Sequence, residues 1–574
     1  MTDSISTYNV DVLIVGGGSA GMWAAKRIKE LAPEKEVAIV DKGPIHMGGL
    51  MAIAGGDMDV VMPDDDVEDW IKDLTYYWDG LCDQDELRQI LNLSFSRFKD
   101  YESYGCNFYK NDDGSYRSIP QRSLKHCRLY PAATKGTGGL DMVMAIRGEI
   151  ERLGVKRICR TVISDLIMED GQPRGAVGFN IRTGRFIVVT AKAVLLATGQ
   201  AMWKPAYGQN TATGEGLEMA FRAGAELRNF EFIKIWNVPK EAAWEGQTTL
   251  LPLGAKFINA LGEPIMERYM PSIGSNTDPH YITRAMALEV NAGRGPIYLD
   301  PTPIKKEDMV LVTPETGWQR INNEMLISMG IDILGGPTEW VPHAQDTLGG
   351  ICADLNGRTR VRGLFAAGRT RNIDAGVYMG GFAIMTTAVT GYLAGEGIVE
   401  FLAEDSQIGG KTDISPSIIE DKRRKLYSPL GKSGIPPHEI VASVRELIFP
   451  HDVCILKNAT ALNRSLNELY KIKEGILNDM SAKDPHYLYK SIEARGMVFS
   501  AELFLRASLE RKESRAGHFR MDFPKRDPAW LAWLIVSGGD RDTIEFNKKP
   551  VPVEKYKHPI NSFYSDQFIM ENIT

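Results

Sequence analysis

Cysteine is scarce in this sequence, and its spacing argues against the common metal sites. The 574 residues include six cysteines, none of which forms a Cys-x-x-Cys pair: Cys82, Cys106, Cys127, Cys159, Cys352 and Cys454. Structural zinc sites and iron–sulfur clusters normally use closely spaced cysteines. We therefore expect six reduced thiols and no metal site, so a redox reaction would need another cofactor.

Positive charge and long apolar runs are also in short supply. The 67 lysines and arginines are outnumbered by 74 aspartates and glutamates, which gives a net charge of −7. This balance argues against nucleic acid as a main partner. No apolar run reaches the roughly 18 residues that cross a bilayer, and residues 1–7 lack the basic and apolar regions of an export signal. We expect no membrane span and a cytoplasmic location.

What the sequence does contain is a dinucleotide-binding motif near its N-terminus. The apolar residues 12–15 lead into Gly16-Gly17-Gly18-Ser19-Ala20-Gly21, and a second apolar strand, 37–40, ends on Asp41. In this Gly-x-Gly-x-x-Gly pattern Gly16 permits the turn, Gly18 admits a pyrophosphate and Gly21 lets the following helix pack closely. The helix N-terminus offers free N–H groups to the phosphates. Asp41 can accept hydrogen bonds from the ribose hydroxyls.

Two later strands indicate that the dinucleotide is FAD. Residues 193–199 end in Ala-Thr-Gly, and residues 361–368 form another apolar strand that ends in glycine. This split pattern resembles flavoproteins that build one FAD site from three distant segments. A helix is expected to open at residue 382, after Gly380-Gly381. Its positive end would point at the flavin pyrimidine ring and stabilise the anionic reduced flavin.

The expected FAD contacts lie in the N-terminal glycine motif, the glycine-rich stretch 43–60, the two later strands and the start of the helix at 382, with Val162 and Glu215 in addition. They are Gly16, Gly18, Ser19, Ala20, Gly21, Asp41, Lys42, Gly48, Gly49, Gly55, Gly56, Val162, Ala197, Thr198, Gly199, Glu215, Gly368, Arg369, Gly381, Ala383 and Ile384.

The pattern along the chain predicts an α/β fold with several parts. We expect a Rossmann-like FAD-binding domain, an inserted α+β capping domain and a C-terminal helical bundle. A polar linker is expected at 404–416. The predicted boundaries are 1–231 and 346–404 for the FAD-binding domain, 232–345 for the cap, 417–539 for the helical domain and 540–574 for an irregular tail.

The segment 511–527 carries a family resemblance. It contains Glu513-Ser514-Arg515-Ala516-Gly517-His518-Phe519-Arg520-Met521-Asp522-Phe523-Pro524. This resembles the Glu-Ser-Arg-Gly-x-His-x-Arg-x-Asp-Tyr-Pro signature of the succinate dehydrogenase, fumarate reductase and L-aspartate oxidase flavoproteins. With the FAD strands and Thr213-Gly214-Glu215-Gly216, the resemblance spans nearly the whole chain. It implies a C-terminal three-helix bundle and a substrate bound between flavin and cap.

The substrate machinery departs from that of the dicarboxylate members. The dicarboxylate members have a carboxylate-binding arginine in the segment that corresponds to residues 376–381, and this segment contains no arginine here. Of their other substrate-binding arginines, only one has a counterpart in this sequence, Arg284. Residues 256–263 and His343 are more similar to the alpha subunit of adenylylsulfate reductase. That branch implies noncovalent FAD and a small separate ferredoxin-like iron–sulfur subunit. His46 lies three residues from the position, near Gly49, that carries FAD covalently in succinate dehydrogenases.

The candidate catalytic residues are polar side chains expected near the flavin: His343, Arg284, His280 and Tyr378. His343 is the preferred general acid or base because histidine titrates near neutrality, and Arg284 could bind an anion bidentately. The candidate substrate contacts are Trp236, Lys256 and Arg371. For His343, Arg284 and Arg371, purely structural roles remain about equally plausible.

Three functions are compatible with these features. The preferred one is a flavoprotein subunit that exchanges electrons between a small anionic substrate and an iron–sulfur partner. The second is a stand-alone flavoenzyme resembling fumarate reductase or L-aspartate oxidase. The third is a noncatalytic electron-transfer subunit.

Overall fold

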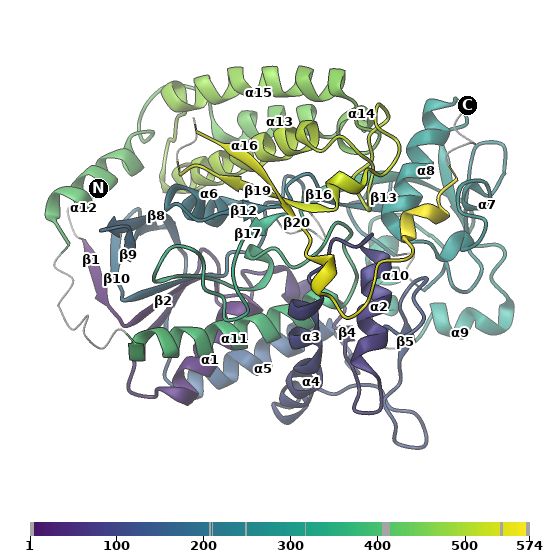
Figure 1. Cartoon of the computed structure of the whole chain (residues 1–574), viewed down its shortest axis with the longest axis horizontal. Helices are drawn as coiled ribbons and strands as arrows, with labels where there is room; N and C mark the ends of the chain where they lie inside the picture. The colour runs from purple at the N-terminus through teal and green to yellow at the C-terminus, as the bar shows by residue number, and fades with distance from the viewer. Residues whose placement is uncertain are drawn as a thin grey trace.

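A five-stranded parallel sheet organises the N-terminal part of the computed structural model (Figure 1). Its order is β18-β11-β2-β3-β7, so neighbouring strands come from distant parts of the chain. The strands are β18 (Leu364–Ala366), β11 (Ala193–Leu196), β2 (Val12–Val15), β3 (Val37–Val40) and β7 (Lys156–Ile158). The chain therefore returns to the same sheet after the long insertion that precedes β18.

The structure describes residues 5–569 except 206–207, 209, 247–248, 316, 405–413 and 540–542. Most of the linker predicted at 404–416 lies outside these described residues, as do the ends of the predicted tail.

Both faces of the parallel sheet are covered, as its continuous apolar strands require. Val12 and Ile14 point to one side and pack with three helices, whereas Leu13 and Val15 point to the other. The helices are α1 (Ser19–Leu31), α5 (Gly138–Arg152) and α11 (Phe382–Glu404). On the other side lie α6 (Glu215–Arg222) and a four-stranded sheet of β1 (Ser6–Asn9), β10 (Phe186–Thr190), β9 (Gln172–Asn180) and β8 (Thr161–Glu169).

Helix α11 is long and apolar enough, by length and composition, to cross a membrane. The sequence predicts no membrane-spanning segment, because no apolar run reaches the roughly 18 residues that cross a bilayer. In the fold, however, 72% of the most apolar window of α11 is buried. Gly391 and Gly395 allow α11 to approach α1 closely, since an added Cβ on Gly391 would lie 2.4 Å from the Ala20 carbonyl oxygen. The helix therefore fills the core.

The insertion forms an antiparallel sheet with helices around it, at the right of Figure 1. The strand order is β13-β16-β15-β14, and β13 pairs with residues 340–347 of β16. The strands are β13 (Ile233–Pro239), β14 (Lys256–Ile258), β15 (Ile297–Asp300) and β16 (Thr338–Thr347). The helices are α7 (Ile265–Tyr269), α8 (Pro279–Asn291), α9 (Met309–Val312) and α10 (Trp318–Ser328).

Between β3 and α5, the chain forms three helices and a small three-stranded sheet. Asp66 and Asp83 cap the first two helices by accepting hydrogen bonds from backbone N–H groups. The helices are α2 (Val67–Tyr77), α3 (Gln84–Asn92) and α4 (Ser94–Ser103). The sheet is β4 (Met58–Asp59), β6 (Arg128–Tyr130) and β5 (Ile119–Pro120).

The C-terminal region packs three long helices together at the top of Figure 1. Its helices are α12 (Pro416–Tyr427), α13 (Pro437–Ile448), α14 (His451–Cys454), α15 (Ala459–Asp479) and α16 (Pro485–Glu510). Most of α16 is buried around its whole circumference, so it forms the centre of the bundle. The family fold predicted from the sequence is thus confirmed.

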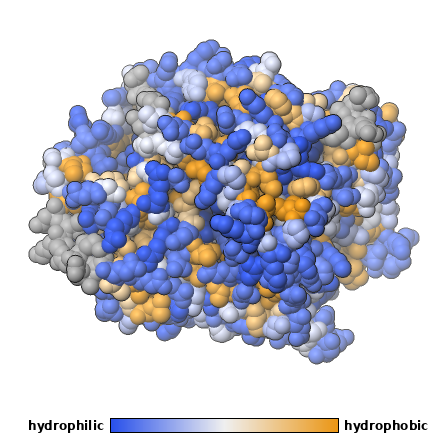
Figure 2. All heavy atoms as spheres, in the orientation of Figure 1, coloured by the Kyte–Doolittle hydropathy of each residue, from blue (hydrophilic) through white to orange (hydrophobic). Residues whose placement is uncertain are grey.

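The predicted irregular tail contains a strand. β20 (Glu545–Pro550) pairs with β19 (Ala532–Ser537) in a sheet completed by β12 (Leu227–Arg228) and β17 (Gly350–Ile351). β20 is an edge strand of mainly exposed polar residues, so it lacks the apolar alternation that reveals a strand in sequence. On the face shown in Figure 2, polar residues predominate and apolar patches are scattered between them.

Candidate functional site

A cavity of about 460 Å³ joins the parallel sheet to the cap. It begins where β2, β3 and β11 end, which is where open α/β sheets bind their ligands. It continues to Lys234 and Trp236 of β13 and Asp346 of β16. All the predicted FAD contacts line it except Gly21: Gly16, Gly18, Ser19, Ala20, Asp41, Lys42, Gly48, Gly49, Gly55, Gly56, Val162, Ala197, Thr198, Gly199, Glu215, Gly368, Arg369, Gly381, Ala383 and Ile384.

The three motif glycines have different reasons to lack a side chain. A Cβ on Gly16, whose φ is +111°, would lie 2.2 Å from the Ala197 carbonyl oxygen. One on Gly21 would lie 2.0 Å from the Gly16 carbonyl oxygen, so these two glycines allow close backbone packing. A Cβ on Gly18 would meet only the Gly49 Cα, at 3.8 Å. Gly18 therefore keeps the cavity open, as a pyrophosphate requires.

Two helix N-termini face the cavity. α1 begins after Gly18, receives no side-chain cap from any described residue and has no acidic residue in its first turn. Its first N–H groups and its positive dipole end are thus available to an anion. Ala383 and Ile384, in the first turn of α11, also line the cavity. This donor arrangement fits FAD at both the pyrophosphate and the flavin.

The adenosine end is held together by buried charges. Asp41 accepts hydrogen bonds from the N–H groups of Gly17 and Gly43, both at 2.6 Å, and burial raises the pKa of Asp41. Each carboxylate oxygen keeps a second lone pair for a ribose hydroxyl. Lys42 pairs with Glu215 of α6 and, at 2.9 Å, with Glu493 of α16. The end of β3 is thereby tied to the C-terminal bundle.

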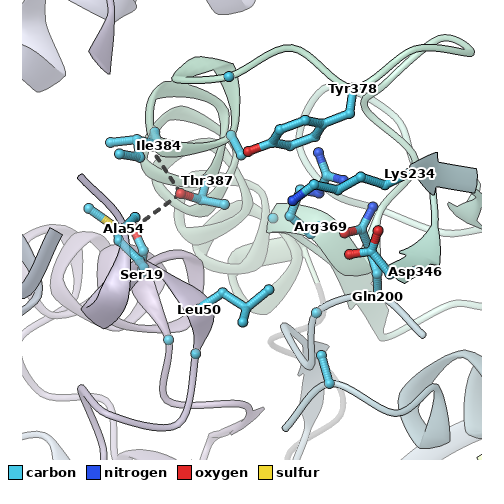
Figure 3. Close-up of a pocket in the computed structure, with 18 of the residues that line it drawn as sticks. Ser19, Leu50, Ala54, Gln200, Lys234, Asp346, Arg369, Tyr378, Ile384 and Thr387 are labelled. Carbon is cyan, nitrogen blue, oxygen red and sulfur yellow. Dashed lines mark hydrogen bonds between the residues drawn. The ribbon is translucent and has the colours of Figure 1, made fainter. Parts of the chain in front are cut away.

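The other end of the cavity carries polar side chains from the cap and from the second segment of the sheet domain. Figure 3 shows Lys234, Arg369 and Asp346 close together, with Tyr378 above them. Lys234 and Asp346 are directly opposite each other on β13 and β16, so they project to the same face. The Lys234 Nζ lies 4.1 Å from the centre of the Tyr378 ring. Burial lowers the pKa of Lys234 to about 8.

This cluster presents polar atoms that lack partners. Arg369 forms an ion pair with Asp374 through Nη1, but its buried Nη2 has no hydrogen-bond partner in the described part of the chain. The same holds for Asp346 Oδ1 and, at the neighbouring aromatic ring, for Trp236 Nε1. Burial raises the pKa of Asp346. Because unpartnered buried polar atoms are costly, these atoms favour a small polar ligand here.

Of the four candidate catalytic residues, only Tyr378 lines the cavity. His343 Nε2 lies 2.9 Å from the Pro205 carbonyl oxygen, and burial together with Lys204 lowers the pKa of His343 to about 4. His280 lies one residue away from the cavity, because its Nδ1 is 2.8 Å from Oδ1 of the lining residue Asp278.

Arg284 is buried next to the C-terminal signature. It donates a hydrogen bond to the Ala516 carbonyl oxygen at 2.9 Å, and its guanidinium lies over the rings of Tyr281, Phe519 and Phe568. Burial lowers the pKa of Arg284. It does not belong to the cavity lining.

Of the three candidate substrate contacts, one lines the cavity and two do not. Trp236 lines the cavity, whereas Lys256 and Arg371 do not. Lys256 forms a surface ion pair with Glu267 at 2.5 Å. Arg371 is buried and pairs with Glu86 of α3.

Sequence reasoning missed Lys234 and Asp346. One signal was available for Lys234: it stands in the apolar stretch Phe232-Ile233-Lys234-Ile235-Trp236, where a buried lysine is unusual. Asp346 precedes Thr347 at the end of β16 and carries no comparable local signal.

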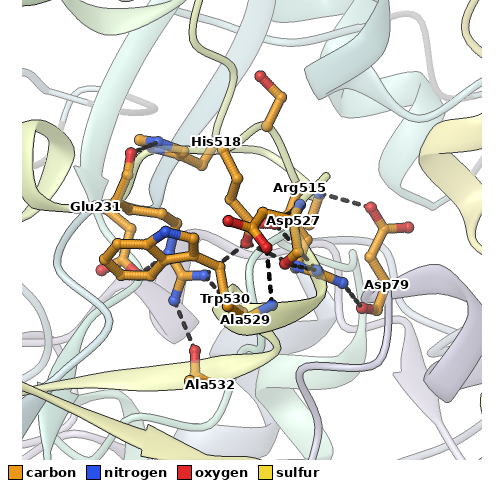
Figure 4. Close-up of polar contacts among 12 residues, drawn as sticks. Asp79, Glu231, Arg515, His518, Asp527, Ala529, Trp530 and Ala532 are labelled. Carbon is orange, nitrogen blue, oxygen red and sulfur yellow. Dashed lines mark hydrogen bonds and ion pairs between the residues drawn. The ribbon is translucent and has the colours of Figure 1, made fainter. Parts of the chain in front are cut away.

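The C-terminal signature forms a buried network beside β13 rather than part of the cavity (Figure 4). Arg511 pairs with Glu231 at 2.7 Å and with Glu513 at 2.8 Å, and Arg515 also pairs with Glu513. His518 is fully buried, and burial with the adjacent Lys457 lowers its pKa well below the ordinary value. Glu231 lies three residues before Lys234, so the network fixes the start of the strand that carries the cavity lysine.

Comparisons with known proteins give the same assignment along almost the entire chain. Residues 11–383 match a family model described as FAD binding domain, and residues 446–563 match one described as fumarate reductase flavoprotein C-term. A fumarate reductase (CoM/CoB) subunit of Methanothermobacter marburgensis is 27% identical over 92% of this chain and 97% of its own length. A fumarate reductase flavoprotein subunit of Mycobacterium tuberculosis is 26% identical over 96% of this chain and 98% of its own length.

Solved structures show the same fold. The Escherichia coli quinol fumarate reductase chain superposes with a TM-score of 0.87 at 23% identity, covering 97% of this chain and 99% of that one. Adenylylsulfate reductase from Archaeoglobus fulgidus superposes with a TM-score of 0.79 at 22% identity, covering 98% of both chains. Both structures therefore share the fold of this chain.

Proposed function

The chain belongs to the succinate dehydrogenase and fumarate reductase flavoprotein family of FAD-dependent oxidoreductases, and on that basis we propose that it is the flavoprotein subunit of a larger enzyme. In this role it exchanges electrons between a small anionic substrate and a ferredoxin-like iron–sulfur partner. Two of its relatives are named as subunits, which supports the assignment.

One observation carries the proposal: a single cavity joins the glycine-lined dinucleotide cradle to a buried polar cluster beneath the cap. When bound, FAD supplies hydride transfer and one-electron exchange. The chain's own residues bind and orient it: Gly18 and the α1 N-terminus at the pyrophosphate, Asp41 at the ribose and the α11 N-terminus at the flavin. FAD is held without a covalent bond, because His46 lies outside the cavity lining.

The polar cluster binds the anionic part of the substrate. The pairing of Arg369 with Asp374 fixes the orientation of the guanidinium while leaving Nη2 available for an anion. Tyr378 and Trp236 supply adjoining aromatic surfaces next to Lys234. Their proximity suits a substrate with one anionic group and a flat or apolar body, more than a dicarboxylate held at both ends.

The test is anaerobic stopped-flow spectroscopy of the purified protein. Its flavin is reduced with a low-potential donor and then mixed with fumarate, with monocarboxylates that carry a conjugated double bond, or with air. Reoxidation by a member of the carboxylate panel, together with co-purification of a small iron–sulfur protein, supports the proposal. Rapid reoxidation by air with peroxide release, and no such partner, would instead indicate an independent oxidase. A flavin that none of these compounds reoxidises would indicate an electron-transfer subunit.

A further inference from the structure

Lys234 occupies an unusual position for a lysine. Its side chain lies in the cavity, and the residue is only 7% exposed. Within the described residues no acceptor or carboxylate lies close enough to its ammonium group to form a hydrogen bond or an ion pair. Instead Nζ lies over the Tyr378 ring at 4.1 Å and the Trp236 ring at 5.2 Å. The two rings contact each other, with their centres 5.7 Å apart, so the ammonium group is free to contact a ligand on the cavity side of the rings.

The surroundings of Lys234 balance opposite charges. The charged and titratable groups that act on it or feel its charge come from the cap and from the loop before α11: Asp346, Arg369, Asp374, Glu245, Tyr378 and His343. Burial and the positive charge of Arg369 lower the pKa of Lys234, the carboxylates oppose them, and the resulting pKa is about 8. Both protonation states are accordingly accessible near neutral pH.

Arg369 and Lys234 differ in what they can do. The Arg369 guanidinium is paired with Asp374, so it serves as a fixed positive charge rather than as a proton donor. A buried lysine can donate a proton as the ammonium and accept one as the neutral amine. Two adjacent cations can thus divide the work of anion binding and proton transfer.

We propose that Lys234 is the catalytic residue that transfers a proton to the substrate during its reduction and removes that proton in the reverse direction. This inference rests on the proposed function. In the forward step the Nζ–H bond breaks, its electron pair stays on Nζ, and the proton bonds to the substrate atom next to the one that receives hydride. The electron pair that reduces the substrate would come with a hydride from the reduced flavin, which returns to oxidised FAD and is reduced again by the proposed iron–sulfur partner.

Asp346 is placed to restore the proton. It is the cross-strand neighbour of Lys234, and its Oδ1 has no hydrogen-bond partner among the described residues. Burial raises the pKa of Asp346, and the nearby positive charges of Lys234 and Arg369 oppose this rise. A neutral Lys234 can regain its proton from this side of the cavity.

The first test measures the titration of Lys234 without relying on turnover. The holoenzyme is reductively methylated with formaldehyde and borane at a series of pH values, and labelling of each lysine is followed by peptide mass spectrometry. We expect half-maximal labelling of Lys234 near pH 8. Lys240 follows the same strand, has an exposed side chain and pairs with Glu339, which raises its pKa, so its labelling should require a higher pH. Equal labelling midpoints for the two lysines would overturn the proposal.

The second test compares Lys234→Arg, Lys234→Met and Lys240→Met by flavin reoxidation with the substrate. Lys234→Arg keeps the positive charge but cannot transfer a proton, so kcat should fall about 100-fold or more while KM stays within about three-fold. The wild-type rate of substrate reduction should decline as pH rises through 8, and this decline should disappear in both Lys234 variants. Lys240→Met should behave as wild type.

The two proposals fail in different ways. A Lys234→Arg protein that turns over at the wild-type rate with the wild-type pH profile contradicts the role of Lys234 and leaves the oxidoreductase function intact. A wild-type protein whose reduced flavin no substrate reoxidises contradicts the proposed function. The labelling midpoint then still decides whether Lys234 can be neutral near pH 8 in the folded protein.

Discussion

The two ends of the cavity are built by different means. At the nucleotide end the contacts come from backbone N–H groups, helix N-termini and glycines that permit close approach, all near Gly16, Gly49 and Gly199. At the substrate end they come from side chains of separate segments, Lys234, Asp346 and Arg369. A backbone site leaves a compact motif in the sequence, whereas a side-chain site depends on which distant residues the fold brings together.

The largest effect should come from closing the nucleotide end. In Gly18→Val the new Cβ would meet only the Gly49 Cα, at 3.8 Å, outside its own chain neighbours and helix backbone. The protein should therefore fold, but the side chain would occupy the space of the pyrophosphate. We expect FAD affinity to fall at least about 100-fold, as measured by flavin fluorescence titration of the apoprotein.

A matched control for this variant is Gly148→Val on α5. A Cβ at Gly148 has no neighbour within 4 Å, and Gly148 does not line the cavity. FAD affinity should be unchanged in this protein. Normal FAD binding by Gly18→Val would show that the pyrophosphate does not bind at the N-terminus of α1.

The next largest effect should come from the fixed cation at the substrate end. Arg369→Ala removes the proposed anion contact, and a hydrogen bond to a charged group contributes about 1.5–3 kcal/mol. We expect KM to rise about 10- to 100-fold with FAD content unchanged, measured by steady-state kinetics of substrate reduction. Arg369→Ala combined with Asp374→Asn tests the same loss without leaving a buried carboxylate unpaired.

Arg371→Ala provides the contrast. Arg371 lies two residues further along but pairs with Glu86 outside the cavity. Breaking this pair should lower the free energy of unfolding and leave KM unchanged. If Arg371→Ala raised KM as much as Arg369→Ala, the substrate would extend beyond the cavity.

The difference between the two ends of the cavity explains which parts of the fold and of the site can be predicted from the sequence. The glycine motif, the three sheet segments and the cap sheet can be predicted because each depends on local periodicity and turn chemistry. The substrate cluster cannot be predicted in this way, because Lys234 and Asp346 become neighbours only through the pairing of β13 with β16. His343 is the opposite case. Its place in the sequence suggests a residue near the flavin, but in the structure it lies outside the cavity lining, with its Nε2 against the Pro205 carbonyl oxygen.

A small effect is expected at His343. In His343→Gln the amide can still donate a hydrogen bond to the Pro205 carbonyl oxygen, so kcat should stay within about two-fold of wild type. The pKa of His343, lowered to about 4 by burial and Lys204, keeps the ring neutral near pH 7. A more than tenfold loss of kcat, or a changed pH profile, would restore His343 as the proton-transfer residue.

The same residue should affect stability in acid. The unfolded chain binds a proton at His343 near pH 6.5, whereas the folded protein does so only near pH 4. The unfolded state therefore binds more protons in this window, and stability falls as pH drops through it. His343→Gln should lose less Tm than wild type between pH 7 and pH 5, as thermal denaturation monitored by circular dichroism can show.

The smallest effect should come from His46, although it lies near the position that carries FAD covalently in succinate dehydrogenases. His46 has a φ of +91°, which favours glycine, and its Nδ1 lies 3.3 Å from Arg147 Nη1 rather than in the cavity lining. We expect His46→Gly to bind as much FAD as wild type, with a free energy of unfolding unchanged or raised by up to about 1 kcal/mol. Acid precipitation should release the flavin from both proteins. Flavin that stays with the precipitated wild-type chain, but not with His46→Gly, would show that FAD is covalently bound through His46. The nucleotide end of the cavity would then depend on a side chain outside the glycine motif as well as on backbone groups.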